Sequence, residues 1–343
     1  MQHFKAHRLH FVTEVQTTVE LNEHQGSALR GAFYHALRRK FCHFSRDREM
    51  HCERCSLATT CPVATLVSTL DPGHQRGRNR PRPYTIQPPL PGSGHPWEWD
   101  DGRVTFRYEP RDTLSFGLTL YGEALALLPY VVLSTTEFEK GGLGRRLEQP
   151  DGRWRRGTIR VREVWTDNPL TGQRQPVIRK DSRQVEVPDI PVTHPQVLKS
   201  VKSREKTGAL ELRFLTPTRL IEHGHLLKPE TFRFRPFFQR LLERLEALSE
   251  QFSDTPLDVD FPALLQEAEA VQVIDHLLTW QEVRSYSTRR HRASHRGGLV
   301  GRVTLHADDW SPLLPWIIWG QFTHVGKSAV KGNGMYRMVN GEW

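Results

Sequence analysis

The sequence lacks the features that mark membrane and secreted proteins. It has no run of about 18 apolar residues, so we expect no transmembrane helix. Its first residues include no apolar secretion segment. Only four cysteines are present, and their restriction to residues 42–61 argues against a secreted protein held together by disulfides. We therefore expect a protein of a reducing cytoplasm with no membrane partner.

Acidic residues are also few relative to basic ones. The chain has 39 Asp and Glu against 48 Lys and Arg, a formal net charge of +9, and a pI near 9.6. Such a balance favours a polyanionic partner, although charge concerns association and not fold. Arginine outnumbers lysine, and arginine suits forked phosphate contacts and stacking on bases.

Hydrophobic periodicity indicates an α+β protein in which one order of elements occurs twice. The first half contains strands at 7–15, 84–86, 104–108, 114–121 and 158–165, with helices at 24–41 and about 123–138. The second half contains strands at 210–220, about 281–286, 298–306 and 334–340, with helices at about 234–248, 258–272 and 312–323. Each half is thus roughly β-α-β-β-α-β, which predicts tandem ferredoxin-like (RRM-like) domains.

The predicted boundaries follow from changes in composition. An N-terminal domain is expected at 1–190, with a cysteine-rich, metal-binding insertion at 42–111 that continues into a stretch rich in Pro, Gly and Arg. Residues 191–208 are expected to be a linker, and 209–343 a C-terminal domain that carries a glycine-rich loop.

The glycine-rich loop near the C-terminus is the most informative stretch. Gly326, Gly332 and Gly334 bracket Lys327 and Lys331, between an apolar helix pattern and a strand pattern. Glycines allow exposed amides to form an anion cradle, and the lysines add charge. The order helix, loop, strand is not that of a nucleotide-binding P-loop. A nucleic-acid backbone is therefore the better ligand.

Two arginine clusters support a nucleic-acid partner. The run from Arg284 to Arg296 has five arginines and no acid, so its side chains can hold phosphates and stack on unpaired bases. A solvated basic hairpin is the alternative. The second cluster surrounds Trp154, a possible stacking surface. The candidate contacts in the first cluster are Arg289, Arg290, Arg292 and Arg296, and the second cluster contains Arg145, Arg146, Arg153, Arg155 and Arg156.

The four cysteines have the spacing of a metal site. Cys52 and Cys55 form a C-x2-C pair, with Cys42 and Cys61 in reach as third and fourth ligands. Four thiolates suit a structural Zn²⁺ ion, and an iron–sulfur cluster is the alternative. Four thiols packed in a core are a further possibility, although their polar neighbours argue against it.

Several strings resemble one known family. The glycine loop is similar to that of the RAMP superfamily of CRISPR-associated proteins, and the resemblance is closest to the endoribonuclease that cuts CRISPR precursor RNA within its repeats. The first helix begins with the family-like string 29–34, LRGAFY. The strings 214–220, FLTPTRL, and 297–303, GGLVGRV, resemble the family's second domain. His324 stands where the family's loop usually has its first glycine.

The resemblance implies a prokaryotic RNA-cleaving enzyme and suggests its residues. Cleavage by a ribose 2′-hydroxyl needs a base, an acid and cations, but no metal ion. In the family the first helix supplies a tyrosine, which Tyr34 matches, and a histidine lies in or just after that helix. His43 is the first candidate, with His35 and His51 as rivals. Arg30 and Arg38 flank Tyr34 on one polar stripe of the helix, as candidate RNA contacts together with His324.

Three functions are compared on this basis. The leading one is maturation of CRISPR transcripts by metal-independent transesterification, which leaves 2′,3′-cyclic phosphate and 5′-hydroxyl ends and allows the enzyme to retain the guide RNA. The second is a non-catalytic RAMP subunit that holds guide RNA in an effector complex with other Cas proteins. The third, a zinc-containing DNA-binding regulator, lacks a recognisable helix-turn-helix or zinc finger. The expected partners are CRISPR repeat RNA or guide RNA.

Overall fold

The computed structural model describes residues 1, 3–47, 50–67, 81–90, 93–98, 104–180, 182, 184–204, 208–253, 256–287, 292–295 and 297–339, without the side chains of 53, 284–287 and 292–295. The chain divides into two units. The N-terminal unit comprises His7–Asp167 and Arg174–Ile190, and the C-terminal unit comprises Met1–Ala6, Asn168–Gln173 and Pro191–Trp343. Both combine helices with antiparallel strand pairs, as predicted. No helix among the described residues has both the length and the apolarity to cross a bilayer.

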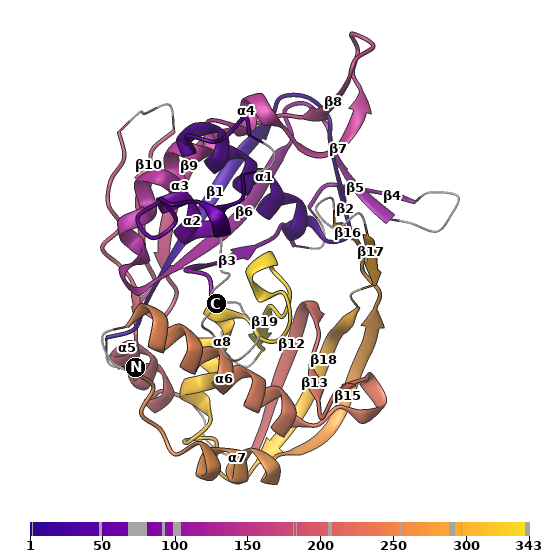
Figure 1. Ribbon diagram of the computed structural model, residues 1–343. Helices are drawn as coiled ribbons and strands as arrows, with labels where there is room; N and C mark the ends of the chain where they lie inside the picture. Colours follow the sequence, from indigo (N-terminus) through magenta and orange to yellow (C-terminus); the bar gives the residue numbers. More distant parts are fainter. Residues whose placement is uncertain are drawn as a thin grey trace. The chain divides into compact units, whose positions relative to one another are not determined.

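The main sheet of the N-terminal unit has the strand order β10-β9-β1-β6-β3 (Figure 1). Along β1, buried and half-buried side chains alternate, because successive side chains of a strand point to opposite faces. On the buried face, Phe11 stacks on Phe116 of β6 with ring centroids 4.9 Å apart. The strands are β1 (Lys5–Val15), β3 (Tyr84–Gln87), β6 (Thr113–Tyr121), β9 (Ile159–Asn168) and β10 (Gln173–Ile178).

Helix α1 (Gln25–Phe41) packs with the predicted stripe inward: Leu29, Phe33, Ala36 and Leu37 are all buried. It contacts α2 (Pro62–Val67), α3 (Leu128–Thr135) and α4 (Phe138–Gly141). The helix predicted at 123–138 is in fact divided into η2 (Gly122–Leu127), α3 and α4. At the end of α3, the Ser134 and Thr135 hydroxyls donate to backbone carbonyls three residues back, which competes with continuation of the helix.

Smaller strand pairs complete the N-terminal unit. One sheet contains β2 (Val19–Asn22), β5 (Val104–Tyr108) and β4 (His95–Glu98), and β7 (Leu143–Glu148) pairs with β8 (Trp154–Gly157). The carboxylate of Glu20 on β2 is fully buried and pairs with Arg107 at 3.2 Å and Arg145 at 2.9 Å. The strand fragments predicted within 42–111 are β3, which belongs to the main sheet, and β5.

The C-terminal unit has the sheet order β15-β18-β12-β19 and the predicted element order β-α-β-β-α-β (Figure 1). Phe214, Phe237 and Tyr336 form an aromatic cluster in its core. The main elements are β12 (Gly208–Thr218), α6 (Phe234–Phe252), α7 (Phe261–Ala270), β15 (Gln272–Gln281), β18 (Gly298–Ala307), α8 (Leu314–Thr323) and β19 (Tyr336–Met338). Short elements are β13 (Ile221–Glu222), β14 (His225–Leu226), η3 (Pro229–Thr231) and η4 (Ala329–Lys331).

Two parts of the C-terminal unit differ from the sequence prediction. The strand predicted at 281–286 is instead the end of β15 followed by a hairpin of β16 (Arg284–Ser287) and β17 (Arg292–His295). The segment predicted as a linker contains β11 (Val192–Thr193), which pairs with β1, and α5 (His194–Lys202). A capping box between Thr193 and Gln196 begins α5, which packs on α8.

Candidate nucleic-acid interface

The glycine-rich loop joins α8 to β19 in the C-terminal unit. Its backbone enters the left-handed half of φ space at five positions, in alternation with ordinary residues. These positions fold the loop back on itself, so that the N–H groups of Val325, Lys327 and Gly334 donate to carbonyls of the protein. The five positions are His324 (φ 59°), Gly326 (78°), Ser328 (66°), Gly332 (87°) and Gly334 (70°).

The loop is held by the end of β12. Lys327 N donates to the Arg219 carbonyl at 3.1 Å, and Gly334 N donates to the Pro217 carbonyl at 3.2 Å. The Thr216 hydroxyl donates to the Gly332 carbonyl at 2.7 Å. A Cβ at position 326 would lie 2.5 Å from the Arg219 carbonyl oxygen, so only glycine fits there. The family-like string 214–220 thus forms the support of the glycine loop.

The backbone of His324 has a conformation that glycine adopts without strain. Its φ of 59° and ψ of 175° lie in a region that side chains strongly disfavour, at a cost of about 1–3 kcal/mol. At this position the loop of the resembling RAMP family usually has its first glycine. The ring is buried, with 3% of the residue exposed. The backbone therefore follows a glycine path with histidine in place of glycine.

The loop presents positive charge and no negative charge. Lys327 is exposed, Lys331 is half-buried, and no acidic residue occurs from His324 to Met338. Arg219, below the loop, donates to the Gly297 carbonyl at 3.2 Å. A loop whose backbone is hydrogen-bonded to the end of β12 and whose lysines add positive charge can bind a phosphate backbone without reading bases.

The polar stripe of α1 is the second predicted region, in the N-terminal unit. Tyr34 accepts a hydrogen bond from Arg38 at 3.4 Å, and the rings of Tyr34 and His35 lie 5.2 Å apart. Arg30 has a buried Nε atom without a hydrogen-bond partner among the described residues. Burial and the nearby charge of Arg30 lower the pKa of Arg82, a neighbour that the sequence did not indicate.

The two leading candidate histidines are both exposed at the surface, but they differ in their charged neighbours. Burial, and then the charges of Arg156, Arg39 and Arg38, lower the pKa of His35. His35 is therefore mainly the neutral imidazole near pH 7, the form that accepts a proton. His43 is exposed just after the helix, with its ring 5.0 Å from that of Phe44. Arg156, on β8, is a neighbour of His35 that no local pattern could reveal.

Arg38 also has a clear structural function. Its guanidinium donates to the Phe44 carbonyl at 2.9 Å and to the Asp47 carbonyl at 3.1 Å, with a longer bond to that of Met50 at 3.5 Å. Although burial opposes its charge, interactions with Tyr34 and Cys42 raise the pKa of Arg38. Arg38 thus fastens the loop after α1 to the helix.

The β7–β8 hairpin carries the second arginine cluster. Trp154 is 64% exposed, so its ring is accessible from solvent. Arg145 is bound by buried Glu20, Arg155 by Asp151, and Arg156 by the Gly144 carbonyl.

The first arginine cluster, from Arg284 to Arg296, lies only partly within the described residues. Arg289, Arg290 and Arg296 lie outside the described residues, and Arg292 lies on β17 with its side chain undescribed.

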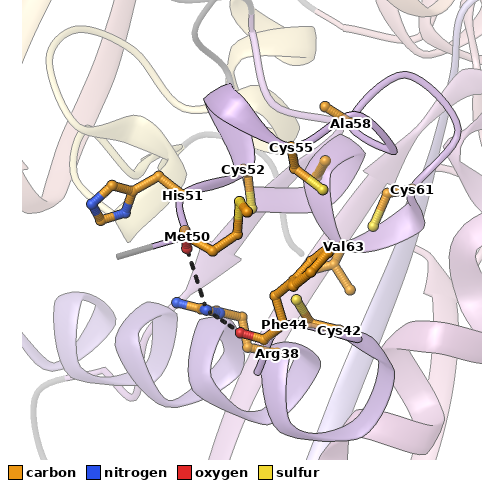
Figure 2. A pocket seen from close by; sticks show the side chains of 11 residues that line it. Arg38, Cys42, Phe44, Met50, His51, Cys52, Cys55, Ala58, Cys61 and Val63 are labelled. Atoms are coloured by element: carbon orange, nitrogen blue, oxygen red, sulfur yellow. Dashed lines mark hydrogen bonds between the residues drawn. The ribbon is translucent and has the colours of Figure 1, made fainter. Parts of the chain in front are cut away.

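The four cysteines line one pocket. None of the four is in a disulfide, and Figure 2 shows their side chains around a common space. Among the described residues, no three Cys, His, Asp or Glu side chains are already grouped closely enough to hold a metal ion. His51 lines the same pocket, but its ring points away from the sulfur atoms (Figure 2).

Comparison with known families covers most of the chain. The family model described as AF_1859_N, N-terminal domain, matches residues 4–190, more than half of the sequence. The model of the CRISPR-associated endoribonuclease Cas6 matches residues 212–336, which include the glycine loop and its support on β12. The chain therefore belongs to the family of the AF_1859_N N-terminal domain, and its C-terminal part matches the CRISPR-associated endoribonuclease Cas6. No curated protein sequence matches it.

Solved structures agree with this assignment at the level of the fold. A Cas6 (TTHB231) product complex matches 98% of this chain and 99% of that chain, with 16% identity and a TM-score of 0.52. The same protein from Thermus thermophilus gives a TM-score of 0.51. A partial Cas6-RT-Cas1–Cas2 complex matches 99% of this chain but 47% of that chain, with 12% identity and a TM-score of 0.59.

Proposed function

We propose that the chain cuts CRISPR precursor RNA within its repeats, and that its two units are copies of a duplicated ferredoxin-like fold. The observation that carries the proposal is the Cas6 family match over the segment that forms the glycine loop. In both units the sheet has the last strand of the β-α-β-β-α-β order beside the first, then the third, then the second. In the N-terminal unit these strands are β9, β1, β6 and β3.

Three regions are candidates for the RNA backbone. The glycine loop supplies Lys327 and Lys331, the polar stripe of α1 supplies Arg30 and Arg38, and the β7–β8 hairpin supplies arginines beside exposed Trp154. Cations gain affinity by releasing counterions from phosphates, and a free aromatic ring can stack on any unpaired base. Three cationic regions together predict strong RNA binding that weakens as the salt concentration rises.

The proposed reaction is an internal transesterification. A base takes the proton of the 2′-hydroxyl, and the resulting oxygen attacks the adjacent phosphorus. The bond to the 5′-oxygen breaks, and an acid protonates that oxygen. The products are a 2′,3′-cyclic phosphate and a 5′-hydroxyl. The reaction needs no metal ion, because imidazoles can move the protons and cations can stabilise the phosphorane.

His43 remains the first candidate for a proton-transfer group, with His35 as its rival. The structure strengthens the case for His35 as the base, because its lowered pKa keeps it neutral. Tyr34, beside His35, is a candidate for orienting the scissile phosphate. An exposed His43 would then be free to supply a proton to the leaving oxygen.

We further propose that the cleaved guide RNA stays bound and that other Cas proteins are partners. The matched structures include one named as a Cas6 product complex and one named as a Cas6-RT-Cas1–Cas2 complex. In this chain, several cationic regions that contact the backbone would hold product as well as substrate, since cleavage removes few phosphate contacts.

The experiment is incubation of the protein with a labelled CRISPR repeat RNA in EDTA, followed by analysis of the product ends. Cleavage with cyclic phosphate ends is expected, and a 2′-deoxy residue at the cut site should abolish it because the nucleophile is absent. A strict requirement for added Mg²⁺ would contradict the mechanism. Tight binding without cleavage would instead favour the alternative function, a non-catalytic guide-RNA subunit.

A further inference from the structure

The loop after α1 brings together every cysteine of the chain. Cys42 directly follows α1, Cys52 begins η1 (Cys52–Arg54), Cys55 directly follows η1, and Cys61 directly precedes α2. Although 19 positions separate the first from the last, all four line one pocket together with Arg38 (Figure 2). The four cysteines are therefore close together in the fold as well as in the sequence.

The backbone around Cys52 and Cys55 has the form of a metal knuckle. Cys55 N donates to the Cys52 carbonyl at 3.3 Å, which closes a single tight turn between the two residues. A C-x2-C pair across such a turn places both thiols on one side, as in structural zinc sites. The other two cysteines directly flank helices, so each of the four is anchored at a defined point.

Besides the side-chain hydrogen bonds of Arg38, the loop is described by backbone hydrogen bonds of local turns, such as Ser45 N to the Cys42 carbonyl at 3.1 Å and Ala58 N to the Cys55 carbonyl at 3.0 Å. No residue from Cys42 to Cys61 that the structure describes is classed as buried. A segment without a core of its own needs another source of stability, and small metal sites supply it.

Burial of four inert thiols does not explain the arrangement. All four cysteines are half-exposed, whereas free cysteine used as a small apolar group is among the most buried residue types. The structure also contains no disulfide among them. Thiols that face one another at a half-exposed site are suited to a thiophilic ion.

We propose that Cys42, Cys52, Cys55 and Cys61 bind one structural Zn²⁺ ion as four thiolates. The sulfur atoms are not yet grouped at ligand distance, so side-chain rotation and a small closure of the turns must accompany binding. Each thiol loses its proton on coordination, and the four thiolates around Zn²⁺ leave a local charge of −2. The guanidinium of Arg38, which lines the pocket, is placed to offset part of that charge.

The ion would fix the segment that carries His43. This histidine directly follows Cys42, and the loop is otherwise fastened to α1 by the hydrogen bonds of Arg38. The site would be closed to substrate because four protein ligands complete a tetrahedral shell. Its effect on RNA cleavage would therefore be indirect, through the position of the loop.

The test begins with metal analysis of the full chain purified without chelator. About one zinc per chain is expected. After chelation, added Co²⁺ should give the intense visible absorption of a tetrahedral cobalt–thiolate centre. Titration of thiols in the native zinc protein should find them protected, and chelation should expose them and open residues 42–61 to protease. Iron with a brown colour would overturn the zinc assignment in favour of a cluster.

Variants separate the ligands from the rest of the loop. The double variant Cys52→Ser/Cys55→Ser should lose its zinc and its cobalt spectrum, whereas Ser56→Ala, an exposed change in the same turn, should keep both. Because the double variant can also fail to fold, the result on the unmodified protein decides. Metal-free protein with four freely reactive thiols and an unchanged protease pattern, or with two disulfides, would overturn the proposal.

Discussion

Val325 and Gly334 clasp the two ends of the glycine loop. The N–H of Val325 donates to the Gly334 carbonyl at 3.0 Å, and a Cβ at position 334 would overlap the Val325 carbonyl oxygen. With a φ of 70°, Gly334 is also in a conformation that side chains rarely adopt. The shape of the loop therefore depends on the absence of one carbon atom.

Replacing Gly334 by Ala should open this clasp. We expect a loss of about 1–3 kcal/mol from backbone strain, with a further loss from the overlap, and weakened RNA binding. Denaturant unfolding and RNA titration measure the two effects. Gly224→Ala is the matched control, because Gly224 has a φ of 85° but open space around it. It should cost about 1 kcal/mol and leave RNA binding unchanged. Equal effects of the two variants on RNA binding would contradict this account of the loop.

The double variant Lys327→Ala/Lys331→Ala should weaken RNA binding most at low salt. Each lost phosphate contact lowers the slope of log K against log salt by roughly 0.7 for a single strand, so the pair should lower it by about 1.4. The control is Lys180→Ala/Lys199→Ala, which removes the same charge from exposed positions outside the loop segment. If both double variants change the slope equally, general charge and not the loop determines binding.

The two histidines should be distinguishable by substitution and single-turnover kinetics. Loss of a general acid or base typically slows catalysis about 10²–10⁴-fold, while RNA still binds. We expect His43→Ala to show such a loss, and His35→Ala to show it if His35 is the base. His225→Ala, a change at an exposed histidine of the C-terminal unit, is the control. Full activity of both the His35 and His43 variants would exclude this pair from the chemistry.

The pH dependence of cleavage tests the function of His35 separately. A base must be neutral to act, and burial with the neighbouring arginines lowers the pKa of His35 from its usual value near 6.5. If His35 is the base, kcat/KM should hold as pH falls through 6.5 and decline only below it. A decline centred at or above 6.5 would assign the base to another group.

Trp154→Ala should weaken RNA binding by about 1–3 kcal/mol if a base stacks on the exposed ring. Trp97 offers a matched control in the same unit: it is 48% exposed, but Arg107 already lies over its ring at 4.8 Å from the centroid. Trp97→Ala should therefore change RNA affinity little. Fluorescence titration of the two variants against one RNA compares them directly, and equal affinities would remove the hairpin from the interface.

The features that were predicted best from the sequence are those that depend on local periodicity. The apolar stripe of α1, the alternation of β1 and the element order of the C-terminal unit follow from spacing alone. The predicted linker was less successful, because its two prolines mask a helix that is stabilised by packing on α8. For example, Trp319 of α8 donates to His194 at the start of α5 at 3.1 Å.

Long-range polar pairing could not be predicted. In the sequence, Glu20 resembles any outward residue of a strand, yet its side chain is fully buried. Its partners, Arg107 and Arg145, lie 87 and 125 positions further along the chain. Arg38 was expected to face RNA, and it also binds the carbonyls of the loop that follows it. The candidate residues themselves were identifiable by type and spacing, whereas the charges around His35 depend on which strand the fold brings to α1.

The way in which the chain is shared between the units has a consequence for its synthesis. The C-terminal unit includes Met1–Ala6, and Phe4 packs edge-on against Trp319 with ring centroids 5.2 Å apart. Because synthesis runs from the N-terminus, Phe4 must wait until residue 319 has been made before it reaches this partner. Until then, β1 can fold only in its N-terminal-unit part, and the apolar Phe4 stays without its tryptophan. Synthesis through residue 319, and not merely past residue 190, is what lets Phe4 reach its place in the C-terminal unit.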